Sequence, residues 1–355
     1  MKIPGLQIGK LMAKVPIVQG GMGVRVSLAS LATAVANEGG IGTISSIGLG
    51  DLNARNSDYV RLSSEALVSE IRKAKSMSNG NLAVNVMDAL TNATELIKTA
   101  VNEGIKMIVV GAGLPLRLPE IVEDESVCLV PIVSSGRAAD LMLRCWDKRY
   151  CRTADGFVLE GPLAGGHLGF STEQLEQIQN YSLEKLLPDV LKAVQPYEDK
   201  YGKKIPIIAG GGIYDGKDIA RMLSLGASAV QMGTRFVCTY ECDASPEFKQ
   251  AYLDATEEDI VLIKSPVGLP GRAIRNVFLK KLEQNGKSKI KCPYRCLSAC
   301  HIDKANYCIA RALLNSWAGA VDEGLIFCGQ NAYRLNKIIS VKELFVELLT
   351  ELRAA

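Results

Sequence analysis

Short apolar runs alternate with amphipathic segments along roughly the first 240 positions of the chain. The runs are rich in β-branched residues, which is typical of strands that are buried on both faces. In the segments between them apolar residues recur every three or four positions, as in helices with one buried face. The predicted strands are Pro16–Gly20, Ile41–Ser46, Leu82–Met87, Met107–Gly111, Cys128–Ser134, Gly156–Glu160, Pro206–Ala209 and Ala229–Met232. The predicted helices are Ser27–Asn37, Ser64–Ala74, Thr91–Val101, Ala138–Trp146, Leu183–Val194 and Lys217–Leu225.

Eight strand–helix units predict an α/β fold, a TIM (β/α)8 barrel. An open Rossmann sheet is the alternative, but it would place its glycine fingerprint after the first strand, and Gln19–Gly23 lacks that spacing. We therefore expect a barrel over residues 1–245 and a helical, cysteine-containing extension or cap over 246–355. Within the extension, Pro246–Thr256, Ala310–Trp317 and Val341–Leu352 are predicted helices, and Ser265–Arg272 is predicted to be a loop because prolines and glycines interrupt it.

The composition narrows the class of protein. The chain has 355 residues, of which 48% are hydrophobic, enough for a large core, and its net charge is only +3. This balance gives no reason to expect nucleic acid or a membrane surface as a partner. No apolar run is long enough to span a bilayer, and the N-terminus lacks the apolar core of a signal peptide. We expect a cytoplasmic protein with a small-molecule substrate, and a homodimer is possible.

Three strand ends open into glycine-rich turns. Gly161–Gly169 contains His167, one of two histidines in the chain, and Pro206–Ile213 and Ala229–Phe236 follow the same pattern. Backbone N–H groups in such turns bind phosphate, and the last two strands of a TIM barrel commonly carry a phosphate site. A lone imidazole beside such a site is a candidate acid or base, although it is also compatible with a tight turn that holds an incidental histidine.

Five sequence motifs occur in a fixed order: Pro-Ile-Val-Gln-Gly-Gly-Met-Gly at 16–23, Asn85 at the end of the third strand, Ala-Gly-Gly-His at 164–167, Ala-Gly-Gly-Gly-Ile at 209–213 and Gln-Met-Gly-Thr-Arg-Phe at 231–236. In these motifs the chain resembles the nitronate monooxygenase family and its relatives, the FMN-dependent enoyl-acyl-carrier-protein reductases. The resemblance implies an FMN-binding TIM barrel in which His167 is the catalytic acid/base or orients the substrate. The residues that it implies for cofactor binding are Gly21, Met22, Asn85, Glu160, Gly165, Gly211, Gly212, Gln231, Met232, Gly233 and Thr234.

The sequence departs from the family pattern at three positions near the histidine. Leu163 replaces a common Glu, Leu168 replaces a common Arg, and Glu160 stands where many monooxygenases have Gln and the reductases often have Glu. The expected activity is that of an FMN-dependent oxidoreductase that oxidises alkyl nitronates with O2. The alternative is a flavin reductase of an enoyl thioester that takes electrons from NAD(P)H. A barrel without catalytic activity is a third possibility, against which the Ala-Gly-Gly-His motif argues.

Four of the 10 cysteines crowd into one segment of the extension, at Cys292, Cys296, Cys300 and Cys308. Zinc usually prefers closer Cys-x2-Cys pairs, whereas a [4Fe–4S] cluster accepts more varied spacing. The same thiols are also compatible with simple packing of a small cap, because free cysteine behaves as a small hydrophobe. An iron–sulfur cluster, zinc and packing therefore all remain open at this point.

Overall fold

A computed structural model describes residues 3–287, 290–298 and 300–355, and eight parallel strands in it form a closed barrel. Around the barrel the strands follow the order β10, β11, β3, β4, β5, β6, β7, β8. All eight predicted strands and the TIM barrel are confirmed. The bounds of the strands are β3 Ile17–Gln19, β4 Ile41–Ser45, β5 Asn81–Met87, β6 Met107–Gly111, β7 Cys128–Val133, β8 Phe157–Glu160, β10 Ile207–Gly210 and β11 Ala229–Met232.

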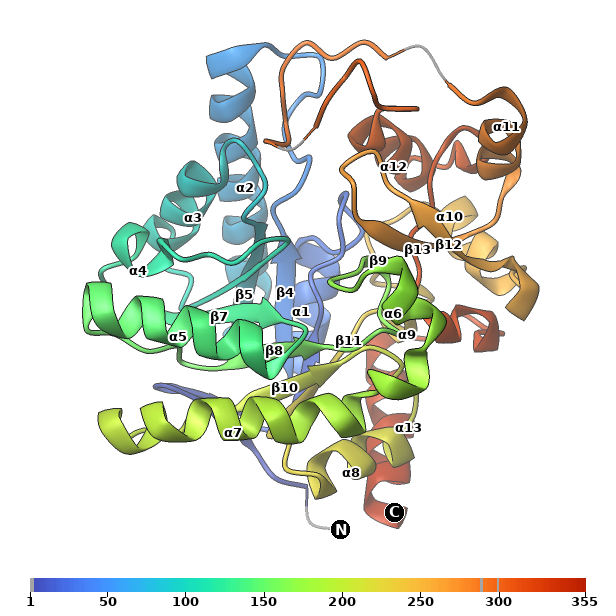
Figure 1. Ribbon diagram of the computed structural model, residues 1–355. Coiled ribbons are helices and arrows are strands. Elements are labelled where there is room, and N and C mark those ends of the chain that lie inside the picture. The colour runs from blue at the N-terminus through green and yellow to red at the C-terminus, as the bar shows by residue number, and fades with distance from the viewer. Residues whose placement is uncertain (1–2, 288–289, 299) are drawn as a thin grey trace.

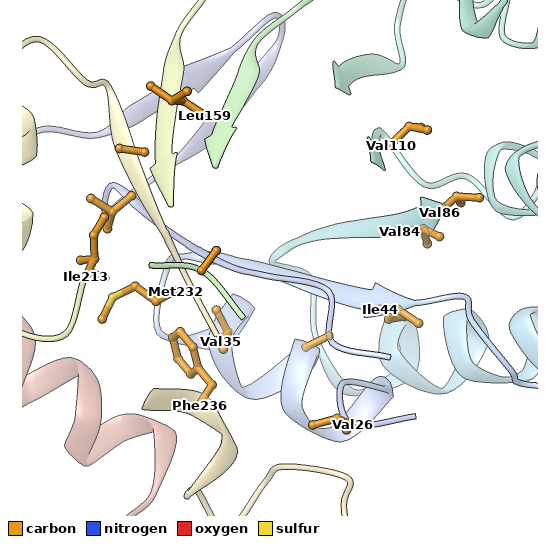
Figure 2. Packing of buried hydrophobic residues seen from close by; sticks show 14 of the residues in the cluster. Val26, Val35, Ile44, Val84, Val86, Val110, Leu159, Ile213, Met232 and Phe236 are labelled. Atoms are coloured by element: carbon orange, nitrogen blue, oxygen red, sulfur yellow. The ribbon is translucent and has the colours of Figure 1, made fainter. Parts of the chain in front are cut away.

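Successive residues along each strand belong to two different layers of the core. On β6, for example, Val109 packs in the barrel interior, whereas Val110 packs between the barrel and its helices. Figure 2 shows the outer layer, in which Val84 and Val86 of β5 and Met232 of β11 belong to one continuous cluster. This alternation follows from the period of two in a strand and explains why the strands read as continuous apolar runs.

The helices surround the barrel (Figure 1). All of the predicted helices are present, and α2, α5 and α7 are longer than expected. Their bounds are α1 Ala29–Asn37, α2 Asn56–Met77, α3 Ala93–Asn102, α4 Leu118–Ile121, α5 Gly136–Tyr150, α6 Thr172–Glu176, α7 Leu183–Tyr201, α8 Gly216–Ser224, α9 Thr234–Val237, α10 Pro246–Leu253, α11 Val277–Asn285, α12 Ile309–Trp317 and α13 Val341–Ala354. Capping boxes start α8 at Asp215 and α13 at Ser340, where each side chain accepts a backbone N–H that would otherwise lack a partner.

An N-terminal hairpin, which the sequence did not indicate, lies against the barrel interior. Its strands are β1 (Leu6–Ile8) and β2 (Leu11–Ala13), and they pair in antiparallel fashion. Leu6, Ile8 and Ala13 are buried in the same cluster as Val109. The hairpin therefore fills part of the space enclosed by the strands and leaves the carboxyl ends of the strands for the functional site.

The extension contributes a sheet that the sequence did not predict. β12 (Ile260–Lys264) pairs with β13 (Pro270–Ile274), and β13 pairs with β9 (Gly166–His167). The expectation of a loop over Ser265–Arg272 is therefore wrong for its last residues, because Pro270–Arg272 belong to β13. Proline is tolerated there because it is the first residue of the strand. This sheet connects the Ala-Gly-Gly-His loop of the barrel to the extension.

The last helix of the chain returns to the barrel, and α13 packs against α8 and α1 (red in Figure 1). Glu351 accepts a hydrogen bond from the backbone N of Gly216 at 2.8 Å. A Cβ atom on Gly216 would lie only 2.4 Å from the backbone N of Leu352, so only glycine permits this approach. The proposed division of the chain at residue 245 stays a prediction, and α13 is a part of the extension that packs directly on barrel helices.

Candidate active site

Two adjoining cavities open at the carboxyl ends of the strands. One has a volume of about 210 Å³ and the other about 410 Å³. Gly21, Glu160 and Gly165 line both of them. The other residues expected to bind the cofactor, and His167, are divided between the two. The smaller cavity is lined by Met22, Gly211, Gly212, Gln231, Met232, Gly233 and Thr234, and the larger by Asn85 and His167. The structure thus brings together every barrel residue that the sequence singled out.

Glycine occurs in the lining of the smaller cavity for two different structural reasons. Gly211 and Gly212 have φ angles of +102° and +82°, in the region that favours glycine. Gly233 lacks this constraint, and a Cβ atom there would meet nothing closer than the sulfur of Met22, at 3.4 Å. Gly233 is therefore free of steric conflict within the protein, and its bare backbone faces a cavity into which a ligand group fits.

A loop of the extension closes this smaller cavity. Thr234 Oγ1 accepts a hydrogen bond from Gly329 N at 3.2 Å, and Asn331 Nδ2 donates one to Gly212 O at 2.8 Å. Gly329, Gln330 and Asn331 all line the cavity. Sequence analysis missed them because they lie almost 100 positions beyond the barrel motifs and follow no strand.

The two cavities meet at a close contact between two strand ends. A Cβ atom on Gly21 would lie 2.4 Å from the Cβ of Asn85, so the loop after β3 touches the end of β5. Asn85 is 8% exposed, and its Nδ2 donates to Val109 O at 3.3 Å. Its carboxamide oxygen remains available to the cavity that it lines.

His167 lies on β9 and is enclosed by the extension. Its Nε2 lies 2.7 Å from Ser265 Oγ, and its ring packs edge-on against Phe327 with centroids 5.1 Å apart. Burial lowers the pKa of His167 to about 4, so the imidazole is neutral at pH 7. This pKa is well below the ordinary imidazole value of 6.5. The apolar wall that the extension builds around the imidazole is the reason.

Glu160 ends β8, beside Gly210 at the end of β10. Burial raises the pKa of its carboxyl to about 7. Among the residues that the structure describes, no lysine or arginine lines either cavity. Burial thus shifts the pKa values of His167 and Glu160 in opposite directions, and both groups are mainly neutral around pH 6.

Arg272 of β13 supports the loop that carries His167. Its guanidinium is 1% exposed and donates to the carbonyl oxygens of Pro162, at 2.8 Å, and of Ala164, at 2.5 Å. Burial lowers the pKa of Arg272. Neither Arg272 nor Ser265 was singled out from the sequence, because both belong to the segment that was expected to be a loop.

The four clustered cysteines lie apart from these strand ends but next to the larger cavity. Cys292, Cys296, Cys300 and Cys308 line one small cavity of their own, and Cys296 also lines the 410 Å³ cavity. Burial, together with the charges of the other three thiols, raises the pKa of Cys296 to about 12. The other six cysteines are free thiols.

A closed parallel barrel with a glycine-lined cavity at the ends of its last two strands defines the class of TIM-barrel enzymes that bind a phosphorylated cofactor. Residues 6–351 match the nitronate monooxygenase family, and the chain belongs to that family. It is therefore a flavin-dependent oxidoreductase. None of the helices in the described part of the chain is both long and apolar enough to cross a membrane.

Two curated relatives and two solved structures are similar to this chain. A (3aS,4S,5R,7aS)-5-hydroxy-7a-methyl-1-oxo-octahydro-1H-indene-4-carboxyl-CoA dehydrogenase from Mycobacterium tuberculosis is 28% identical over 274 residues, which cover 77% of this chain and 67% of that protein. A probable nitronate monooxygenase from Staphylococcus aureus is 26% identical, with 76% and 78% covered. The structure of FabK from Thermotoga maritima is 25% identical to this chain in sequence, with a TM-score of 0.73. The match covers 96% of this chain and 94% of the FabK chain. A nitroalkane oxidase from Streptomyces ansochromogenes shares the fold, with a TM-score of 0.74, 21% identity and 97% of both chains covered.

Proposed function

We propose that the chain binds FMN across the two cavities and oxidises alkyl nitronates with O2. The observation that carries this proposal is the junction of a glycine-lined cavity with a larger one that contains His167 and Glu160. FMN, when bound, supplies the redox chemistry, and the protein supplies orientation and electrostatics.

The residues of the smaller cavity suit the phosphate of FMN. Backbone N–H groups at Gly211, Gly212 and Gly233 bind phosphate oxygens, and the hydroxyl of Thr234 adds a further donor. The space beside Gly233 supports this assignment, because a side chain there would enter the cavity with no contact closer than 3.4 Å to the protein. Gly21, Met22 and Asn85 lie at the junction and on its two sides, where the flavin ring would contact them.

We assign different roles to His167 and Glu160. His167 is neutral at pH 7 and is fixed by Ser265 at Nε2, so it orients the substrate and offers Nδ1 for hydrogen bonding. Glu160 has a pKa near 7, which is the better match for a group that takes or gives a proton at neutral pH. Its protonated form also donates a hydrogen bond to an anionic nitronate, in a cavity that no lysine or arginine of the described residues lines.

A second function is favoured by the lining of the larger cavity. Leu114, Ile132, Leu168 and Leu297 are among its apolar residues, and no cation is present there among the described residues. Such a cavity suits a neutral acyl chain, and two relatives are named as a CoA-ester dehydrogenase and FabK. The second candidate is therefore the NAD(P)H-dependent reduction of an enoyl thioester.

One experiment separates the two functions. The cofactor of the purified protein is released by heat and identified by mass spectrometry, and FAD alone would contradict the FMN assignment. The protein is then mixed without oxygen with ethyl nitronate, NADH or NADPH, and the flavin absorbance near 450 nm is followed. Rapid bleaching by nitronate alone supports the first function. Bleaching by a nicotinamide nucleotide, followed by reoxidation with crotonyl-CoA, supports the second.

A further inference from the structure

Residues 290–298 and 300–310 of the extension hold four thiols around one small cavity. Cys292, Cys296, Cys300 and Cys308 all line it. They are partly buried and free of disulfides. Cys296 also borders the larger cavity, but the role proposed for that cavity requires none of the four thiols.

The arrangement of the thiols does not suit a single metal ion. Zinc requires four ligand atoms around one point, with sulfur about 2.3 Å from the metal. Within the described residues, no three His, Cys, Asp or Glu side chains form such a group. Four cysteines placed around a cavity are the ligand set of a cluster of several atoms, since iron–sulfur clusters are held by four thiolates.

Three further features of this cavity suit an anionic cluster. Tyr307 lines it and is 5% exposed, yet among the described residues its hydroxyl has no hydrogen-bond partner. Such a buried hydroxyl is a donor in need of an acceptor, and cluster sulfur is one. Arg295 also lines the cavity, and Cys308 stands at the N-terminus of α12, where negative charge is stabilised.

We propose that Cys292, Cys296, Cys300 and Cys308 bind a [4Fe–4S] cluster. The segment is held against the barrel, because Thr91 N donates to Cys296 O at 3.1 Å and Ser298 N donates to Ala89 O at 2.9 Å. Thr91 and Ala89 belong to the loop that follows β5, the strand of Asn85. Cys296 lines both the thiol cavity and the larger cavity of the active site, so the cluster borders the space proposed for substrate.

The test is metal analysis of the full-length protein purified without oxygen. We expect about four iron atoms and four acid-labile sulfides per chain, and an electron paramagnetic resonance signal after reduction with dithionite. Cys300→Ser should lower iron and sulfide severalfold and abolish the signal. The matched control is Cys145→Ser, a partly buried cysteine of α5, which should retain both.

Two results would overturn the proposal. One is protein that carries zinc instead of iron. The other is protein without metal whose four thiols react with a thiol reagent after unfolding. Both results are measured on the wild-type protein, so they test the proposal even if Cys300→Ser does not fold. Iron and sulfide are measured independently of flavin and turnover, so failure of this proposal is distinct from failure of the nitronate or enoyl activity.

Discussion

Nε2 of His167 lies 2.7 Å from Oγ of Ser265, although the two residues are 98 positions apart in the chain. His167 comes from a loop of the barrel, and Ser265 follows β12 of the extension. Pairing of β9 with β13 brings them together, because Gly271 is the register partner of His167. The orientation of the imidazole therefore depends on a segment outside the barrel strands.

Removal of this hydrogen bond should affect turnover less than removal of the ring. Ser265→Ala should lower kcat by roughly 5–10-fold, the value of one hydrogen bond of about 1 kcal/mol. His167→Ala should lower it by about 10²–10⁴-fold if the ring orients the substrate or handles its proton. Steady-state rates with nitronate, neutral nitroalkane and enoyl thioester measure both effects. Ser171→Ala, at an exposed helix cap, is the control, and equal rates for His167→Ala and wild type with flavin bound would leave the histidine a structural role.

Activity on a preformed nitronate should fall as the pH rises through about 7. The pKa of Glu160 lies near that value, so its carboxyl is neutral below it and negative above it. A negative carboxylate repels an anionic substrate where no cation lines the cavities in the described part of the chain. Glu160→Gln should remove this decline in kcat/KM. An unchanged decline in the variant would assign the pH dependence to another group.

The raised pKa of Glu160 also predicts how the stability of the folded protein depends on pH. The pKa of Glu160 in the folded protein is above its ordinary value of 4.5, so its contribution to stability is fully present below pH 4.5 and is lost as the pH rises through about 7. Glu160→Gln should therefore stabilise the flavin-free protein at pH 8 by on the order of 3 kcal/mol, with no gain at pH 4. Denaturant unfolding at the two pH values measures the difference, and an equal effect at both would contradict the raised pKa.

A side chain at Gly233 should displace the cofactor and spare the fold. In Gly233→Ala the new methyl group meets only the sulfur of Met22, at 3.4 Å, and enters the cavity proposed for phosphate. We expect a marked loss of FMN with thermal unfolding of the flavin-free protein unchanged. Gly212→Ala is the contrasting variant, because its φ of +82° and a contact of 2.8 Å with Leu163 should also destabilise the fold. Full flavin content in Gly233→Ala would place the phosphate elsewhere.

Loss of the Arg272 guanidinium should destabilise the loop that carries His167. Arg272→Met leaves the buried carbonyl oxygens of Pro162 and Ala164 without their donor. Each such group costs about 1–3 kcal/mol, so we expect a comparable drop in the free energy of unfolding. Arg275→Met, which removes only an exposed ion pair with Glu283, is the control and should change stability little. A small effect in both variants would show that the loop does not need its support.

The barrel was predictable because short stretches of the sequence determine each of its strands. Each strand is a continuous apolar run, and Gly211, Gly212 and Gly233, which we propose bind phosphate, come at the ends of two of these runs, so the strand and the residues at its end are identified together. The β9–β13 pairing was not predictable in this way, since β9 has only two residues and β13 begins with proline and glycine. Their pairing is decided by tertiary contacts, which override local preference.

The pKa shifts of the site also could not be predicted from the sequence. The sequence identified His167 and Glu160, but not the direction of their pKa shifts, because burial by Phe327 and the rest of the extension causes the shift at His167. Ser265 and Arg272 show the same limit, since a hydroxyl or guanidinium carries no signal of its partner 98 or 110 positions away.

The return of α13 to α8 and α1 has a consequence for how the chain matures during synthesis. Gly216 receives its partners Glu351 and Leu352 only after these two residues have been synthesised, long after the strands of the barrel. The loop around Gly329, which closes the smaller cavity, also emerges after every barrel strand. A nascent chain therefore has all eight strands before it has the loop that closes the smaller cavity. A chain cut short before Gly329 would have the complete barrel but an open cavity at the ends of β10 and β11.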